Sequence, residues 1–236
     1  MGKLYLIPTP IDDNDVFNSI PLYNKTIIDG IRIFVVEEIR TARRFLRKIS
    51  PNFPIDDCQF YILNEHTSQS IDLSSILQFA IDGNDIGLVS EAGMPCVADP
   101  GSNLVLLAQQ KNIKIIPLSG PSSITMTLMA SGLCGQNFAF NGYLPTDKSE
   151  LINKIRKLEQ YSSSQHQTQL FIETPYRNNQ LFETLLKECK SNTYICIACN
   201  ISQEDGYIKT KTVAEWKKNL PDSLHKKLCV FAVLAM

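Results

Sequence analysis

The sequence lacks the features that mark membrane proteins and strongly basic proteins that coat nucleic acid. No apolar run approaches the roughly 18–20 residues that a membrane helix needs. The 23 Lys and Arg residues are balanced by 24 Asp and Glu residues, which gives a formal net charge of −1. A protein surface that is basic throughout is therefore excluded, although a local basic patch is not. With 44% hydrophobic and 20% charged residues, the 236-residue chain can bury a core, so we expect no extensive disorder.

Motifs for common nucleotide and metal sites are also missing. The sequence contains neither GxxxxGK[ST] nor GxGxxG, which disfavours nucleotide cofactors of those types. Its seven cysteines are scattered, which fits a reduced, cytoplasmic compartment. Cys196 and Cys199 have CxxC spacing without a second pair, so we expect buried strand cysteines and no metal site. The first residues lack the apolar region and cleavage site of a signal peptide, and we expect a strand there.

Short apolar runs alternate with helical patterns along the chain. Helices are expected over 71–81, over 103–111 after a Ser102 cap, from Thr174-Pro175 to Glu188, and over 213–220 after a Thr212 cap. The expected strands are 3–7, 31–36, 59–63, 85–89, 114–118, 138–143, 169–173, 194–199 and 227–234. Such alternation predicts an α/β protein with parallel sheets covered on both faces.

A break near Ser119-Gly120-Pro121 predicts two α/β lobes, an N-terminal one over 1–118 and a C-terminal one over 119–236. A cleft between lobes is a usual place for a ligand. The polar stretch 162–167 is predicted to be a mobile loop.

Turn-rich loops that follow predicted strands are the candidate ligand-binding segments. The loop 90–101 contains Gly93 and Gly101, and the loop 119–123 contains Gly120. In open α/β sheets ligands bind at the carboxyl ends of strands, and glycine lets the backbone approach a ligand closely. The alternative for each loop is a tight strand-to-helix connection without a ligand.

Three further places carry charged or titratable residues after a strand. Arg177 is expected in the first turn of a helix, either paired with Glu173 or binding an anion. Glu38 and Arg40 precede a basic helical segment that is a solvated face or a positive patch for an acidic substrate. His66 is a surface residue or a catalytic one.

At these loops the sequence resembles the tetrapyrrole methylase superfamily, the class III S-adenosylmethionine-dependent methyltransferases. Within it, the sequence is most similar to the ribosomal RNA small subunit methyltransferase I family. The matching stretches are LYLIPTPI (4–11), VEEIR (36–40), LVSEAGMPCVADPGSNLV (88–105), PLSGPSS (117–123), ASGL (130–133), FNGYLP (140–145) and FIETPYR (171–177). The resemblance implies a homodimer of two-lobed subunits with the cofactor cleft between the lobes.

The resemblance also implies the site residues. S-adenosylmethionine would be held largely by backbone groups in the three loops that follow the strands predicted over 3–7, 85–89 and 114–118. The residues are Pro8, Ser90, Glu91, Ala92, Gly93, Met94, Val97, Ser119, Gly120, Pro121 and Ser122. The acceptor would be a ribose 2′-hydroxyl of small-subunit ribosomal RNA. Removal of its proton calls for a nearby base, and the candidate catalytic residues are Glu173, Asp99, His66 and Glu38, with Arg177 as an anion-binding residue.

The chain departs from the family in its first loop, which carries Asp12, Asp13, Asn14 and Asp15 where the family has glycines. The usual His-Asn-Glu after the third strand is His66-Thr67-Ser68, and the family's segment after the last strand has no counterpart here. These differences concern substrate recognition more than cofactor binding. Two alternatives to an RNA methyltransferase therefore stay open: a small-molecule methyltransferase of the tetrapyrrole type, and a cofactor-binding protein without catalysis.

Overall fold

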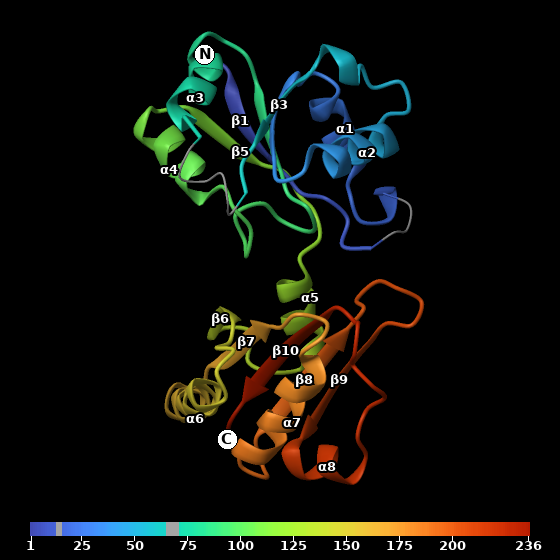
Figure 1. Ribbon diagram of the computed structural model, residues 1–236, viewed down its shortest axis with the longest axis vertical. Helices are drawn as coiled ribbons and strands as arrows, with labels where there is room; N and C mark the ends of the chain where they lie inside the picture. Colours follow the sequence, from blue (N-terminus) through green and yellow to red (C-terminus); the bar gives the residue numbers. More distant parts are fainter. Residues whose placement is uncertain (13–15, 65–70) are drawn as a thin grey trace. The chain divides into compact units, whose positions relative to one another are not determined.

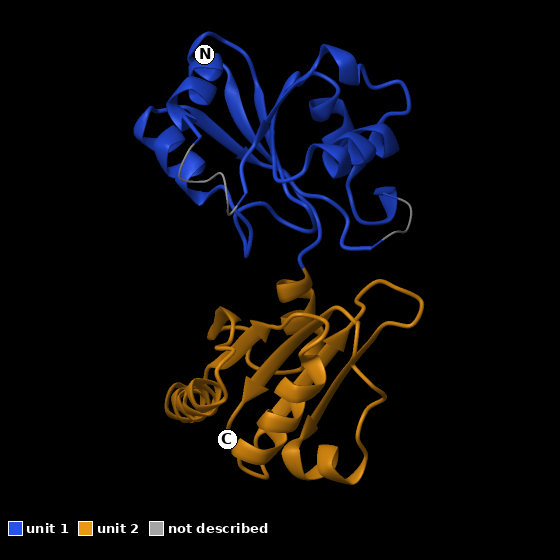
Figure 2. Ribbon diagram, viewed as in Figure 1, with its two compact units in different colours: residues 1–122 blue, residues 123–236 orange. Residues whose placement is uncertain are grey.

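The computed structural model describes residues 1–12, 16–64 and 71–236, and it divides the chain into two compact units (Figures 1 and 2). Unit 1 is Met1–Ser122 and unit 2 is Ser123–Met236. Residues 119–122 belong to unit 1 because the Ser119 carbonyl accepts a hydrogen bond of 2.8 Å from the buried Asn24 side chain. Each unit is an α/β layer structure, which confirms the predicted fold class.

Unit 1 contains a parallel sheet of five strands in the order β3-β2-β4-β1-β5. The strands are β1 (Lys3–Ile7), β2 (Ile33–Val36), β3 (Gln59–Ile62), β4 (Ile86–Val89) and β5 (Lys114–Pro117). All five were predicted from their apolar, β-branched composition, and β2 and β4 are buried throughout. Parallel pairing places the loops that follow these strands at one edge of the sheet.

Helices cover both faces of this sheet. The helices α1 (Leu22–Ile28) and α2 (Ile39–Ile49) pack on one face, and α3 (Leu73–Ile81) and α4 (Ser102–Gln110) pack on the other (Figure 1). Two short 3₁₀ helices, Val16–Asn18 and Ile55–Asp57, complete the unit. Helix α4 begins at Ser102 itself, one residue earlier than expected, and its N-cap is Gly101 with φ of +121°.

Unit 2 contains a mixed sheet in the order β6-β7-β10-β8-β9. The strands are β6 (Phe138–Tyr143), β7 (Thr168–Ile172), β8 (Tyr194–Cys199), β9 (Tyr207–Thr212) and β10 (Cys229–Leu234). The expectation of parallel pairing is wrong here, because β10 runs antiparallel to both β7 and β8, and β9 runs antiparallel to β8. Cys196 and Cys199 are buried in β8, as predicted.

The helices of unit 2 differ from the predictions at two places. Helix α6 (Lys148–Gln165) includes most of the predicted mobile loop, because the buried Ser162 hydroxyl accepts a hydrogen bond of 3.0 Å from the Ala235 amide. Helix α7 (Asn178–Glu188) begins after Arg177, not at Thr174-Pro175. The remaining helices are α5 (Ser123–Ser131) and α8 (Val213–Lys218), and Thr212 caps α8 as predicted.

Helices also cover both faces of the second sheet. Helices α6, α7 and α8 pack on one face around Trp216 and Phe231, and α5 packs on the other through Ile124 and Leu128. No helix among the described residues is long and apolar enough to cross a membrane.

Candidate active site

Loops from three neighbouring strands meet at the carboxyl edge of the first sheet. Strand β1 lies between β4 and β5, and the residue Thr9 after β1 pairs with Gly93 after β4 through two backbone hydrogen bonds of 3.0 and 3.1 Å. A Cβ atom placed on Gly93 would lie 3.5 Å from the Pro121 carbonyl oxygen, which belongs to the loop after β5. A Cβ atom on Gly120 would lie 2.3 Å from Cγ of Pro8. The predicted glycine loops are therefore neighbours, and all of them lie in unit 1.

Buried hydroxyl groups fold the loop after β4. The Ser90 hydroxyl donates a hydrogen bond of 2.5 Å to the Gly93 carbonyl oxygen, and it lies 3.3 Å from the Thr9 hydroxyl oxygen. Both side chains are buried, and Gly93 has φ of +82°, which disfavours a residue with a Cβ. The loop is thus held in one conformation before any ligand binds, which lowers the entropic cost of binding.

The residues expected to hold the cofactor differ in their exposure to solvent. Pro8, Ser90, Gly93, Pro121 and Ser122 are buried, whereas Glu91, Ala92, Val97 and Ser119 are exposed and Met94 and Gly120 are half-buried. A hollow of about 170 Å³ opens beside this loop, and Thr9, Pro10, Ser90 and Glu91 are among its lining residues. The glycine-rich, pre-folded backbone and the adjacent hollow fit a ligand held mainly by backbone groups.

Three residues that position these loops were not predicted from the sequence. Thr41 in α2 donates a hydrogen bond of 2.6 Å from its hydroxyl to Oε1 of Glu91, and so joins the helix to the loop. Asn24 and Thr9 contribute the side-chain bonds described above. None of the three carries a charge, and only their position in the fold reveals their role.

Asp99 lies in a second hollow on unit 1, of about 350 Å³, which Leu63, Asn64 and the first turn of α4 help to line. Its side chain is half-buried, and its Oδ2 atom has no hydrogen-bond partner among the described residues. Burial, with a smaller contribution from the negative charge of Glu91, raises the pKa of Asp99 from its usual 3.8 to about 6. A carboxylate with a pKa near the working pH is suited to accept a proton during a reaction.

Because the pKa of Asp99 is higher in the folded chain than in the unfolded chain, the stability of the protein should depend on pH. The folded chain keeps this proton up to about pH 6, whereas the unfolded chain loses it near pH 3.8, so stability falls as pH rises through this window. Asp99→Asn removes the buried charge, and we expect it to raise the thermal midpoint more at about pH 7.5 than at about pH 4.5. Thermal unfolding followed by circular dichroism at both pH values checks this. An equal gain at the two pH values would contradict the prediction.

In unit 2, Arg177 and Glu173 form an ion pair, which is one of the two alternatives that the sequence left open. Nη2 of Arg177 lies 2.8 Å from Oε2 of Glu173, whose side chain is 1% exposed. The Thr174 amide donates a hydrogen bond of 2.7 Å to the other carboxylate oxygen. Nη2 of Arg177 also donates to the Pro145 carbonyl oxygen at 3.3 Å. Glu173 therefore holds Arg177 in place, and the guanidinium keeps further N–H donors for an anion.

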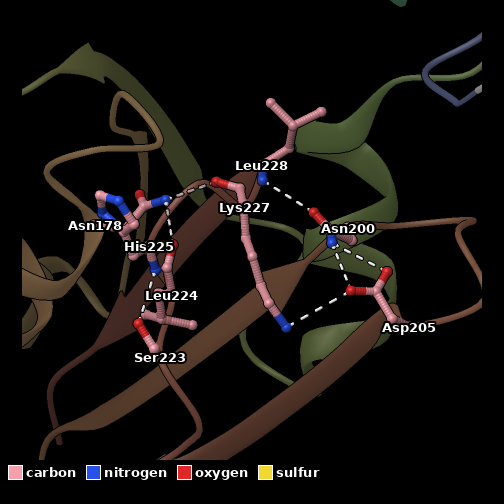
Figure 3. Close-up of polar contacts among 8 residues, drawn as sticks. All are labelled: Asn178, Asn200, Asp205, Ser223, Leu224, His225, Lys227 and Leu228. Atoms are coloured by element: carbon pink, nitrogen blue, oxygen red, sulfur yellow. Dashed lines mark hydrogen bonds and ion pairs between the residues drawn. The ribbon is translucent and has the colours of Figure 1, made fainter.

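The segment before β10 supports the start of α7 at Asn178, the residue that follows Arg177 (Figure 3). Asn178 is fully buried, and its Nδ2 donates hydrogen bonds to the carbonyl oxygens of Lys227 at 2.8 Å and Leu224 at 3.3 Å. Nζ of Lys227 lies 3.6 Å from Oδ2 of Asp205, which also accepts a hydrogen bond of 2.9 Å from Asn200. These contacts join the start of α7 to both ends of the β8–β9 connection.

Asn178 should therefore matter for the stability of unit 2. Asn178→Ala leaves two carbonyl oxygens without their donor, at a buried position. We expect it to lower the free energy of unfolding by about 1–3 kcal/mol. Urea unfolding of the whole chain measures this. Asn153→Ala, at an exposed position of α6, is the matched control and should not lower stability, since alanine favours helix. Equal stability of the two variants would contradict the assigned role.

His66 lies outside the described residues. Glu38 acts as the N-cap of α2, where its side chain accepts a hydrogen bond of 2.9 Å from the Arg40 amide. The predicted basic helical segment is helix α2, and Arg40, Arg43, Arg44, Arg47 and Lys48 are all exposed.

Comparison with known proteins identifies related sequences over nearly the whole chain. The family model Tetrapyrrole (Corrin/Porphyrin) Methylases matches residues 3–217. The ribosomal RNA small subunit methyltransferase I of Vibrio cholerae is 27% identical over 212 residues, which cover 90% of this chain and 69% of the relative. The protein of the same name from Halalkalibacterium halodurans is 32% identical and covers 78% of this chain and 60% of the relative. The match thus spans about two thirds of the length of these relatives.

Solved structures show the same fold at low sequence identity. The methyltransferase CobJ superposes with a TM-score of 0.63 and 14% identity, and the match covers 100% of this chain and 95% of that one. Diphthine synthase superposes with a TM-score of 0.64 and 16% identity, covering 100% and 90%. The shared fold is therefore retained across proteins whose sequences have diverged widely.

Proposed function

The chain belongs to the tetrapyrrole (corrin/porphyrin) methylase family, and from that premise we propose that it transfers the methyl group of S-adenosylmethionine to RNA. The acceptor that we propose is a ribose 2′-hydroxyl of small-subunit ribosomal RNA. The named relatives, ribosomal RNA small subunit methyltransferases I, support small-subunit ribosomal RNA as the substrate, and the ribose hydroxyl rests on the sequence resemblance. The observation that carries the proposal is the meeting of the Thr9, Gly93 and Pro121 loops at one edge of the first sheet.

The residues at this edge fit S-adenosylmethionine. Gly120 packs so closely on Pro8 that no side chain fits there, which holds the loops after β1 and β5 together. We assign cofactor binding to Ser90, Gly93 and Gly120, together with Pro8, Glu91, Ala92, Met94, Val97, Ser119, Pro121 and Ser122. When bound, the cofactor supplies a methyl group already activated by the positive sulfur. The protein then mainly has to orient the acceptor, which can contribute about 7–11 kcal/mol to lowering the barrier.

We assign the role of general base to Asp99. A hydroxyl acceptor has to lose its proton, and Asp99 offers a carboxylate oxygen without a hydrogen-bond partner among the described residues, in a hollow. Glu173 is less suited, because both of its oxygens are engaged by Thr174 and Arg177. Arg177 is the residue that we assign to an anionic group of the substrate, since its guanidinium can bind phosphate through two N–H groups.

We further propose that the chain works as a homodimer in the cytoplasm. The family resemblance supports the dimer. All seven cysteines are free, and this supports a reducing compartment.

Transfer of a labelled methyl group tests the proposed function. Purified protein is incubated with methyl-labelled S-adenosylmethionine and with small ribosomal subunits or, separately, a corrinoid substrate. We expect label in the ribosomal RNA and none in the corrinoid. Label in the corrinoid alone would identify a small-molecule methyltransferase. Binding of S-adenosylmethionine without transfer to either would support a cofactor-binding protein that has lost catalysis.

A further inference from the structure

Helix α2 presents an unusual concentration of positive charge on unit 1. Its 11 residues, IRTARRFLRKI, include five basic side chains and no acidic one. The whole chain has a net charge of −1, so the remaining 18 cations and 24 carboxylates give −6 for the other residues. The positive charge is therefore a local property of this helix and not of the protein surface in general.

The basic side chains form one continuous exposed surface. The opposite side of the helix is buried against the first sheet, in the hydrophobic core of unit 1, through Ala42, Phe45, Leu46 and Ile49. A shallow groove of about 580 Å³ is lined by Arg40, Arg43, Arg44, Arg47 and Lys48, which we call the basic face. From Arg40 to Lys48 the helix rises about 12 Å. This length matches several successive phosphates of a nucleic-acid strand.

Among the described residues, the basic face forms one ion pair. Arg43 is paired with Asp56 at 3.0 Å, but Asp56 is 90% exposed, so that contact is weak. Among the residues that the structure describes, no carboxylate forms an ion pair with Arg40, Arg44, Arg47 or Lys48. Four of the five cations therefore have no ion-pair partner in the described part of the chain and can bind an external anion.

The arrangement works against the stability of the helix itself. Arg40 and Arg44, Arg43 and Arg47, and Arg44 and Lys48 are all spaced i, i+4, and like charges at this spacing repel. Arg40 also lies in the first turn, where the helix dipole disfavours a cation. The dipole explains only the two cations of the last turn, Arg47 and Lys48. A polyanionic ligand along the helix would account for the others.

The basic face adjoins the candidate cofactor loops. Arg44 and Lys48 also line the hollow beside Ser90 and Glu91, and Thr41 of the same helix bonds to Glu91. A strand that follows the basic face would therefore run beside the loop that we assign to S-adenosylmethionine. We propose that the basic face binds the phosphate backbone of the RNA substrate next to the methyl-transfer site. This inference rests on the proposed function and identifies which surface holds its substrate.

The test uses the double variant Arg43→Gln/Arg47→Gln in the full chain, because neither residue lines the hollow beside Ser90. The control is Lys157→Gln/Lys187→Gln, which removes the same charge from exposed positions of α6 and α7. Binding of a fluorescein-labelled single-stranded RNA of mixed sequence is followed by polarisation between about 50 and 200 mM KCl. Anionic phosphatidylglycerol vesicles serve as a second polyanion. Transfer of labelled methyl groups to small ribosomal subunits is measured on the same samples.

We expect the α2 variant to bind RNA roughly tenfold more weakly, and the slope of log affinity against log salt to fall by about 1.4, since each phosphate contact to a single strand contributes about 0.7. The control should stay within about twofold of the wild type, and the thermal midpoint of the α2 variant should not fall, since repulsion is relieved. Unchanged RNA affinity and slope in the α2 variant, with methyl transfer intact in the wild type, would overturn this inference alone. A wild type that neither binds nor methylates RNA would overturn the proposed function with it. Loss of vesicle binding without loss of RNA binding would assign the basic face to a membrane instead and overturn the inference.

Discussion

Gly120→Ala should weaken the binding of S-adenosylmethionine by about 10–100-fold, because overpacking costs about 1–3 kcal/mol and binding has to restore the displaced loops. The new Cβ would lie 2.3 Å from Cγ and 2.5 Å from Cβ of Pro8, far inside van der Waals contact. The proline ring cannot rotate away, so the loop after β1 has to move, and with it the pairing of Thr9 with Gly93. Calorimetric titration of the folded variant with S-adenosylmethionine measures the loss.

Two further variants separate this effect from general destabilisation. Gly135→Ala is the matched control, since a Cβ there has no atom within 4 Å and affinity should stay unchanged. Combining Gly120→Ala with Pro8→Gly removes both Pro8 atoms that the new methyl group meets, Cγ and Cβ, and should recover part of the lost affinity. Overpacking costs about 1–3 kcal/mol of stability, which urea unfolding of each variant would show. Affinity of Gly120→Ala within threefold of the wild type would contradict the assigned role of this contact.

Asp99→Asn should lower kcat/KM for methyl transfer to RNA by about 10²–10⁴-fold, the usual contribution of a general base. The wild-type rate should rise with pH through a midpoint near 6, where the pKa of Asp99 lies, because only the ionised carboxylate accepts a proton. The variant should lack this rise and should still bind S-adenosylmethionine. Initial rates across the pH range, with small ribosomal subunits as substrate, test both statements.

The expected stability of Asp99→Asn allows a loss of rate to be assigned to the missing base and not to unfolding. The variant is expected to be at least as stable as the wild type at neutral pH, so unfolding would not explain low activity. Asp222→Asn, at an exposed position of unit 2, removes one carboxylate as a control and should keep the wild-type pH profile. A variant at position 99 with a wild-type rate and an unchanged pH profile would exclude Asp99 as the base.

The first sheet was predictable because its strands β2 and β4 are buried on both faces. Such strands form short continuous apolar runs, as in IFVV of β2 and IGLV of β4, and they leave a clear signal in the sequence. The loops 90–101 and 119–123 could be selected on the same basis, since glycine follows these runs. That Gly93 approaches Pro121, and that Gly120 packs on Pro8, depends on the strand order, which local patterns do not contain.

The second sheet was harder to predict because tertiary contacts override the local patterns. Strand β9, with the sequence YIKTKT, lies at a sheet edge, has polar residues at its last four positions and lacks a strong apolar run. The end of α6 could not be predicted from local sequence, because its buried polar side chains have partners far along the chain. Ser162 accepts a hydrogen bond from the Ala235 amide, and Glu159 accepts one from the Lys190 amide. Thr174 was predicted to cap α7, but its carbonyl oxygen accepts a hydrogen bond of 2.9 Å from the Arg177 amide, and this turn delays the helix.

Hydrogen exchange with and without S-adenosylhomocysteine, the demethylated cofactor product, tests the central claim most directly. We predict slower exchange of backbone amides in 88–95 and 118–123, with α6 unchanged, because the two loops share one ligand. Unchanged exchange in both loops at saturating ligand, or protection confined to other segments, would contradict the claim that these loops hold the cofactor.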